Sequence, residues 1–360
     1  MRASLPFVAV LSCLLSGCNL PRPWVHAKKT TGCDPAPGIP ESGSELFITL
    51  RTVRCGQAMI FEDYRSPEAI YAARSRTGIE ARFTKENWLK AFTDRQRLNP
   101  GLPPILFFHG YNNNQAMAFE RAQKIAILVC HYRPVIAITW PSYGRAMPYG
   151  WDEANNEWAK PLVREVVEGL ASVKQPVVIV AHSMGSRLGL EIAAVEAAKP
   201  PGERGVRELI LASPDADQNS FNHWLSSKPA DFPVTLYGST RDQALSASWR
   251  WHGYARAGDL SKWVTGNVAT FPYAAAGLTV VDTSDVRDGL MGHAVFIETR
   301  QGMADLCRVL TIGDVGVGRT PDNVKHPGYS KLLRKDDADD DCAKRANTIL
   351  PSKRAPSPRP

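Results

Sequence analysis

Short apolar runs alternate along this chain with longer stretches in which apolar residues recur at helical spacing. The short runs occupy residues 104–108, 135–140, 177–180, 208–212, 233–237 and 278–282. The helical spacing occupies residues 115–131, 155–172, 186–198, 243–249 and 294–310. Strands that alternate with helices are joined by crossovers, which place the strands parallel and cover both faces of the sheet. The pattern therefore predicts an α/β fold with a mostly parallel central sheet and helices on both faces.

The two ends of the chain lack this pattern. With 360 residues and 44% apolar content, the chain can bury one large core, and we expect a single domain over residues 45–310. Residues 18–44 are rich in Pro, Gly, Ser and Thr, which predicts a flexible tether. Residues 311–360 combine basic residues, an acidic run and a Pro-containing end, which predicts a disordered tail.

A serine lies where the third apolar run meets the following helix. The segment Ala181-His182-Ser183-Met184-Gly185 ends the run and opens the helical stretch. A tight turn between a parallel strand and a helix pushes the central side chain out from the sheet edge, and its neighbours must be small. Gly185 is one small neighbour, and Ala181 replaces the other glycine of the usual pattern. The position is that of a nucleophilic serine.

Other strand ends carry the groups that such a serine needs. The run 104–108 leads directly into His109-Gly110-Tyr111-Asn112-Asn113. Hydrolases with a nucleophilic serine at a strand-to-helix turn place an oxyanion donor in this loop. The run 233–237 is followed by Asp242, and the run 278–282 leads to His293. The carboxyl ends of parallel strands meet at one edge of a sheet, so these groups are expected to gather there.

On these residues the chain resembles the α/β-hydrolase superfamily. More narrowly, it resembles a bacterial α/β-hydrolase family of unassigned physiological role, over roughly residues 45–310. The blocks that carry the resemblance are H-G-Y-N-N (109–113), W-P-S-Y-G (140–144), A-H-S-M-G-S-R (181–187), A-S-P-D-A-D (212–217), L-Y-G-S-T-R-D-Q-A-L (236–245) and G-H (292–293). They are specific for the fold and much less so for the substrate.

The chemistry expected of these residues is acyl transfer through an acyl-enzyme intermediate. Ser183 would attack while His293 removes its proton as general base and returns it to the leaving group. Asp242 would hold the imidazole in the right tautomer and stabilise the imidazolium. The backbone N–H groups of Met184 and Tyr111 would form the oxyanion hole.

Other polar residues near the motifs have competing roles. Asp215 and Asp217 follow the run 208–212, a position from which some α/β hydrolases take their acid, although the resemblance favours the aspartate after the next strand. Ser142 and Asp152 could line the pocket. The alternative for Asp152 is that it caps the following helix. Arg187 is expected to form an ion pair with Asp215 or Asp217.

The remaining histidines and aromatic residues mostly suggest structural roles. The side chains of His109 and His182 are expected to bond backbone carbonyls rather than perform chemistry. Residues 247–273 form a long aromatic excursion, which is either a lid or ordinary packing. The tryptophans also suggest core or lid packing: Trp140, Trp151, Trp158, Trp224, Trp249, Trp251 and Trp263.

The amino terminus resembles a bacterial lipoprotein signal peptide. A short positive start precedes an apolar stretch at residues 5–15, which is too short to span a bilayer, and Leu15-Ser16-Gly17-Cys18 ends it. By this resemblance, residues 1–17 would be removed and Cys18 would carry palmitate-like acyl chains that hold the protein on a membrane. Asn19 gives no acidic sorting signal, which favours the outer membrane over the inner one. The alternative is an ordinary secretory signal.

Cysteine use fits an oxidising compartment. Cys33 with Cys55 is the favoured pair because it would fasten the tether to the first strand. Free buried thiols are the alternative for all five cysteines that would remain in the mature chain: Cys33, Cys55, Cys130, Cys307 and Cys342. No Cys or His spacing suggests a metal site, and no cofactor is expected.

Charge adds little to the functional prediction. The net charge is +7, but basic and acidic residues are mixed and no basic run with interleaved aromatic residues occurs, so nucleic acid is not an expected partner. The sequence predicts a lipase-like serine hydrolase of carboxylic esters or thioesters at the bacterial cell envelope. The alternative is a catalytically silent lipoprotein that uses the same fold for binding or scaffolding.

Overall fold

A computed structural model describes most of the chain between Cys33 and Leu350. Within that range it leaves out residues 57, 99, 145–148, 173–175, 264–275, 287–288, 314–315, 322–327 and 336–337. The predicted signal peptide (residues 1–17), the predicted lipidation site Cys18 and residues 351–360 lie outside the described residues.

The described strands form one sheet in the order β10-β11-β9-β8-β7-β6-β4-β5-β1-β2-β3. The central strands pair in parallel, whereas β2, β3 and β10 are antiparallel to their neighbours. Their bounds are β1 Glu45–Cys55, β2 Met59–Arg74, β3 Glu80–Arg82, β4 Ile105–Phe108, β5 Val135–Thr139, β6 Val177–His182, β7 Val206–Ala212, β8 Val234–Gly238, β9 Leu278–Asp282, β10 Arg319–Pro321 and β11 Tyr329–Leu332.

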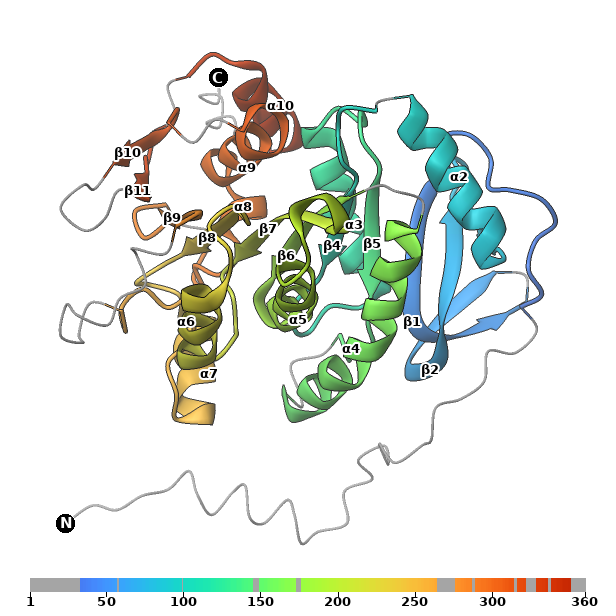
Figure 1. Cartoon of the computed structure of the whole chain (residues 1–360), viewed down its shortest axis with the longest axis horizontal. Coiled ribbons are helices and arrows are strands. Elements are labelled where there is room, and N and C mark those ends of the chain that lie inside the picture. Colours follow the sequence, from blue (N-terminus) through green and yellow to red (C-terminus); the bar gives the residue numbers. More distant parts are fainter. Residues whose placement is uncertain are drawn as a thin grey trace, which may run out of the picture.

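Helices cover both faces of this sheet (Figure 1). One face packs against α2 Lys85–Arg97, α4 Tyr149–Ala171, α5 Ser186–Ala197 and α6 Gln218–Ser227. The other packs against α3 Gln115–Leu128, α8 Val295–Glu298, α9 Arg300–Ile312 and α10 Asp341–Ile349. Helix α7, Gln243–His252, follows β8. Along β6, Ile179 faces the first core and Val180 the second. A strand buried on both sides therefore appears in the sequence as a continuous apolar run.

The α/β fold with a mostly parallel central sheet is confirmed. Each of the six apolar runs coincides with a strand, β4 to β9, and the helical stretches coincide with α3, α4, α5, α7 and the pair α8–α9. The last stretch is divided because Thr299 is extended and caps α9 by accepting a hydrogen bond from the Gly302 N–H at 3.0 Å.

The tether prediction is wrong for residues 33–44. Cys33 forms the expected disulfide with Cys55, and the guanidinium of Arg95 donates to the carbonyls of Glu41 and Ser44. This segment is therefore fastened to the domain. The cause is a set of contacts with residues distant in the sequence, which local composition does not reveal.

The prediction of a disordered tail is also wrong for residues 319–321, 328–335 and 338–349, which the structure describes. Strand β11 pairs in parallel with β9, and the tail helix α10 is linked to α9 by the disulfide Cys307–Cys342. The buried guanidinium of Arg308 adds an ion pair with Asp340 at 2.7 Å. The disulfide and the ion pair thus hold this segment on the domain, although its apolar content is small.

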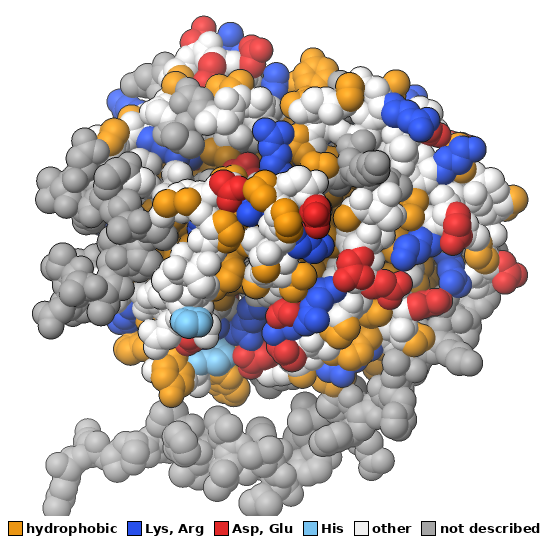
Figure 2. Space-filling model, viewed as in Figure 1, with side chains coloured by type: hydrophobic (Ala, Val, Ile, Leu, Met, Phe, Trp, Pro, Cys, Tyr) orange, Lys and Arg blue, Asp and Glu red, His pale blue; other side chains and the backbone are white. Residues whose placement is uncertain are grey.

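Charges of both signs are interspersed on the face that Figure 2 shows. Ion pairs among the described residues include those of Lys160 and Arg164 with Glu191. Among the described helices, none has the length and apolar content needed to cross a membrane.

Candidate active site

Ser183 lies at a sharp turn between β6 and α5. Residues Ser183–Gly185 form a short 3₁₀ turn, and Ser183 has a positive φ of 53°. A non-glycine residue in this backbone region is strained, and such strain gathers at functional positions. The turn places Ser183 at the carboxyl edge of the sheet, as the sequence pattern predicts.

Close packing explains the small residues around this turn. A Cβ on Gly185 would overlap the carbonyl oxygens of Phe108 and His109, and a Cβ on Gly110 would lie 2.8 Å from the Ser183 Cβ. Ala181 is tolerated where a glycine is usual because Gly189, one turn into α5, leaves room: a Cβ there would approach the Ala181 Cβ to 3.0 Å. The motif variation is thus accommodated by a glycine on the helix.

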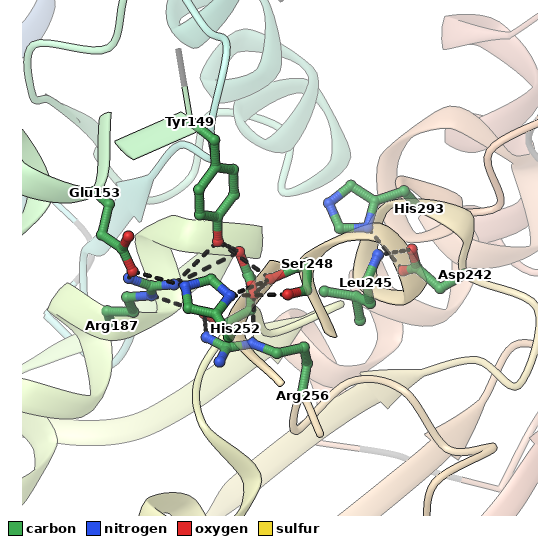
Figure 3. Close-up of polar contacts among 10 residues, drawn as sticks. Tyr149, Glu153, Arg187, Asp242, Leu245, Ser248, His252, Arg256 and His293 are labelled. Atoms are coloured by element: carbon green, nitrogen blue, oxygen red, sulfur yellow. Dashed lines mark hydrogen bonds and ion pairs between the residues drawn. The ribbon is translucent and has the colours of Figure 1, made fainter. Parts of the chain in front are cut away.

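Asp242 and His293 are joined directly. The Nδ1 of His293 lies 2.7 Å from the Oδ2 of Asp242, whose side chain is fully buried (Figure 3). The other carboxylate oxygen accepts from the Leu245 N–H at 2.9 Å and so caps α7. Burial disfavours the imidazolium, but the charge and hydrogen bond of Asp242 outweigh it and raise the pKa of His293 above its usual value.

The loop that follows β4 is held by buried polar groups. The Asn112 N–H donates to Asp152 Oδ2 at 3.0 Å, and the Asn113 N–H donates to Ser142 Oγ at 3.0 Å. The Ser142 hydroxyl in turn donates to Asp152. The Tyr111 N–H lies between these anchors and Gly110, and no acceptor for it is found among the described residues. A donor with no protein acceptor in a fixed loop is what an oxyanion hole requires.

Ser142 and Asp152 therefore have a different role from those considered in the sequence. Neither lines the cavity beside Ser183, and Asp152 lies inside the first turn of α4 rather than at its N-cap. Buried Arg51, which the sequence did not single out, donates to the carbonyls of Asn113 and Ser142. Together these groups fix the loop that presents Tyr111.

His109 and His182 bond backbone carbonyls, as predicted. His109 Nδ1 lies 3.0 Å from the Gly110 carbonyl oxygen, and the ring stacks on Trp140; burial lowers the pKa of His109 to about 3. His182 Nε2 lies 3.2 Å from the His293 carbonyl oxygen. Arg121 donates to His182 Nδ1 at 3.1 Å, which assigns the proton of the neutral ring to Nε2. His182 thus holds the backbone of His293.

A cavity of about 590 Å³ brings these groups together. Ser183, His182, His293 and Arg121 are among its lining residues. Its other walls are aromatic, apolar and a few polar residues: Tyr111, Asn112, Asn113, Met117, Tyr149, Asp215, Ala244, Leu245, Ala247, Ser248, Trp251, Leu290, Met291, Ala294 and Glu298. Such a mainly apolar pocket with a few polar groups is typical of a small-molecule site.

Asp215 belongs to a separate ionic cluster in one wall of this cavity. Its carboxylate accepts from Arg256 at 2.7 Å and Ser248 at 2.6 Å, and from the Tyr149 hydroxyl. Burial disfavours the carboxylate, but Arg256 and Arg187 outweigh it and lower the pKa of Asp215. Figure 3 shows this cluster apart from the His293 and Asp242 pair. Since His293 bonds Asp242, Asp215 is not the aspartate that orients it.

Arg187 forms the expected ion pair with Asp215, at 3.8 Å, and a shorter one with Glu153 at 2.6 Å. Asp217 instead caps α6 by accepting from the Ser220 N–H at 2.8 Å. The sequence did not single out Tyr149, Ser248 or Arg256, because they come from three separate segments and no local motif connects them.

The aromatic excursion is described in part. Residues 247–263 include the end of α7 and the buried Trp263, whereas residues 264–273 lie outside the described residues. Trp140 and Trp263 are buried, as expected for packing, whereas Trp251 is 69% exposed and lines the cavity. Among the described residues, no cluster of His, Cys, Asp or Glu is arranged to hold a metal ion.

A comparison with protein-family models agrees with the fold. The model of the family described as "Alpha/beta hydrolase of unknown function (DUF900)" matches residues 84–309. No curated protein matches the chain. Two similar solved structures are the Bacillus licheniformis lipase BlEst2 in mature form (14% identity, 52% of this chain, 84% of that one, TM-score 0.31) and Aspergillus fumigatus lipase B (15%, 52%, 47%, 0.28). At these TM-scores, neither similarity bears on the activity.

Proposed function

Because this chain belongs to the family of alpha/beta hydrolases of unknown function, we propose that it is a serine hydrolase of carboxylic esters or thioesters. In this proposal Ser183 is the nucleophile, His293 the general base and Asp242 the acid that orients it. The Tyr111 and Met184 N–H groups form the oxyanion hole. The single observation that carries the proposal is the 2.7 Å contact between His293 Nδ1 and Asp242 Oδ2. His293 lines the same cavity as Ser183, whose backbone is strained.

The proposed reaction proceeds in two steps. Ser183 attacks the carbonyl carbon as His293 takes the hydroxyl proton, and the oxyanion forms against the two backbone donors. His293 then gives its proton to the leaving alcohol or thiol, leaving the acyl-enzyme. Water, deprotonated by His293, attacks the acyl carbon of that ester. His293 then returns the proton to Ser183 Oγ as the carboxylic acid leaves. Asp242 stabilises the imidazolium that forms in each step.

We also infer that the protein is exported and held at the bacterial envelope through acyl chains on Cys18. Support comes from the apolar stretch before Leu15-Ser16-Gly17-Cys18 and from the disulfides of Cys33 and Cys307, since such bonds persist in oxidising compartments. The lack of an acidic residue at position 19 favours the outer membrane.

A fluorophosphonate probe tests the catalytic proposal. We expect the wild-type protein to be labelled on Ser183, Ser183→Ala to be unlabelled, and Asp242→Asn to react roughly a thousandfold more slowly. Asp217→Asn is the matched control because asparagine keeps the cap of α6, so its labelling rate is expected to match that of the wild type. A folded protein that stays unlabelled would instead support the catalytically silent, scaffolding lipoprotein.

A further inference from the structure

Large apolar side chains surround the mouth of the catalytic cavity and point to solvent. Leu290 is 96% exposed, Trp251 69% and Met291 52%, and all three line the cavity. Met117, on α3, adds a fourth exposed apolar residue to the lining. Exposed apolar patches that border a site usually mark a surface that another molecule covers.

Exposed basic residues lie near Trp251 in the sequence, and the acidic lining residue Glu298 is paired with Arg121 at 3.2 Å. Arg250 and Tyr254, next to Trp251 in sequence, are both exposed, and so is Arg241, just before α7. Between residues 239 and 258, Asp242 is the sole acidic residue, and it is fully buried. The segment 289–291 lies against this helix, since the Gln243 N–H donates to the Met291 carbonyl at 2.9 Å. Met117, Trp251, Leu290 and Met291 line the cavity, whereas Arg250 and Tyr254 are exposed neighbours of Trp251 in the sequence. We call these six residues the mouth surface.

The described chain begins near the same edge of the molecule. Strand β1 runs parallel to β5, so its carboxyl end, Cys55, points toward the edge that carries Ser183 and α7. Cys33 is bonded to Cys55, and residues 1–32 precede it. Figure 1 shows α4, which begins at that edge, and α7 reaching the same side of the molecule. A lipid anchor on Cys18 would thus pull this side toward the membrane.

We propose that the mouth surface docks on a bilayer that contains anionic phospholipid, and that the cavity takes lipid esters from it. Trp and Tyr are favoured at the membrane interface, apolar side chains enter it, and arginines are attracted to anionic headgroups. Charge and polarity of the mouth surface match these three requirements. The docking proposal depends only on the exposed residues of the mouth surface, whereas the cleavage of lipid esters rests on the proposed hydrolase function.

Hydrogen exchange of the full chain locates the contact. We expect peptides that cover residues 243–254 and 289–292 to become protected when vesicles of phosphatidylcholine and phosphatidylglycerol are added, and less so with phosphatidylcholine alone. Ser183→Ala is expected to show the same protection, because docking does not need the nucleophile. Absence of protection at these peptides, or self-association through them without vesicles, would overturn the docking proposal.

A double variant, Arg250→Gln with Tyr254→Ser, tests whether docking delivers the substrate. We expect its hydrolysis of an ester embedded in the anionic vesicles to fall about tenfold, through lost headgroup attraction and lost apolar contact. Its hydrolysis of a dissolved short-chain ester is expected to stay within about twofold, since neither residue lines the catalytic cavity.

The matched control is Arg97→Gln with Leu98→Ser, an exposed basic and apolar pair at the end of α2, on the opposite side of the molecule from α7 (Figure 1). It is expected to leave both rates unchanged. An equal loss in both double variants would overturn the proposal. If the wild type did not hydrolyse the dissolved ester but vesicles still protected these peptides, the proposed hydrolase function would be overturned and the docking proposal would stand.

Discussion

At the residue scale, charges near His293, the candidate base, have opposing effects on its pKa. Burial disfavours its protonated form, Asp242 and more distant Asp215 favour it, and Arg121 disfavours it. The net result is a raised pKa. A raised pKa favours the protonated imidazole, the form that returns the proton to a leaving group.

The pH dependence of kcat/KM should reveal this balance. Attack requires neutral His293, so kcat/KM is expected to fall as the pH drops through its raised pKa, with a midpoint above 6.5. Asp242→Asn should move this limb to lower pH, because it removes the main stabiliser of the imidazolium. Arg121→Gln should move it to higher pH, because it removes a repelling charge. A wild-type midpoint below 6.5, or shifts in the same direction, would contradict the assignment.

At the scale of elements, the loop after β4 depends on a carboxylate that lies outside every motif. Asp152 Oδ2 accepts from the Asn112 N–H and the Ser142 hydroxyl, and Oδ1 accepts from the Tyr143 N–H at 2.8 Å. An amide in its place would turn an NH₂ group toward one of these donors. We therefore expect the loop, and with it the Tyr111 N–H, to shift.

Asp152→Asn is expected to lower kcat for a dissolved ester by about ten- to a hundredfold, less than the complete loss of an oxyanion donor, and to cost about 1–3 kcal/mol of stability. Steady-state kinetics and thermal unfolding measure the two effects. Glu157→Gln, an exposed acidic position on the same helix, is the control and should change neither. An unchanged kcat with a lower Tm would show that Asp152 supports folding alone.

Sequence patterns predicted the central sheet because its strands are buried on both faces and therefore apolar throughout. Strand β2 was missed because most of its first half is only partly buried and carries charged residues. Its pairing with β1 is set by tertiary contacts. The candidate triad was predictable because each member follows a strand. The Asp215 cluster was not, since Tyr149, Ser248 and Arg256 meet through the fold.

At the scale of the whole molecule, two disulfides fasten the terminal segments to the domain. Cys33–Cys55 holds the start of the described chain, and Cys307–Cys342 holds α10; the paired cysteines have sequence separations of 22 and 35. Loops of this size correspond to roughly 3–4 kcal/mol each in the chain-entropy treatment. The order of both ends is thus linked to the oxidation state of the compartment.

This link leads to a prediction for Cys342→Ser. The variant is expected to unfold at a temperature lower by roughly 5–10 °C, because α10 loses its covalent tie to α9 while the Arg308–Asp340 ion pair remains. Its activity on a dissolved ester at 25 °C should be unchanged, since α10 takes no part in the cavity. Differential scanning calorimetry under oxidising and reducing conditions measures the shift.

Cys130→Ser is the matched control, because Cys130 is the one free cysteine among the described residues. Its Tm should stay close to that of the wild type in both conditions, whereas reduction should bring the wild type down to or below the Cys342→Ser value. If reduction left the wild-type Tm unchanged, the tail would be ordered by packing alone. Export would then no longer be needed to explain its structure, and the envelope location would rest on the signal sequence.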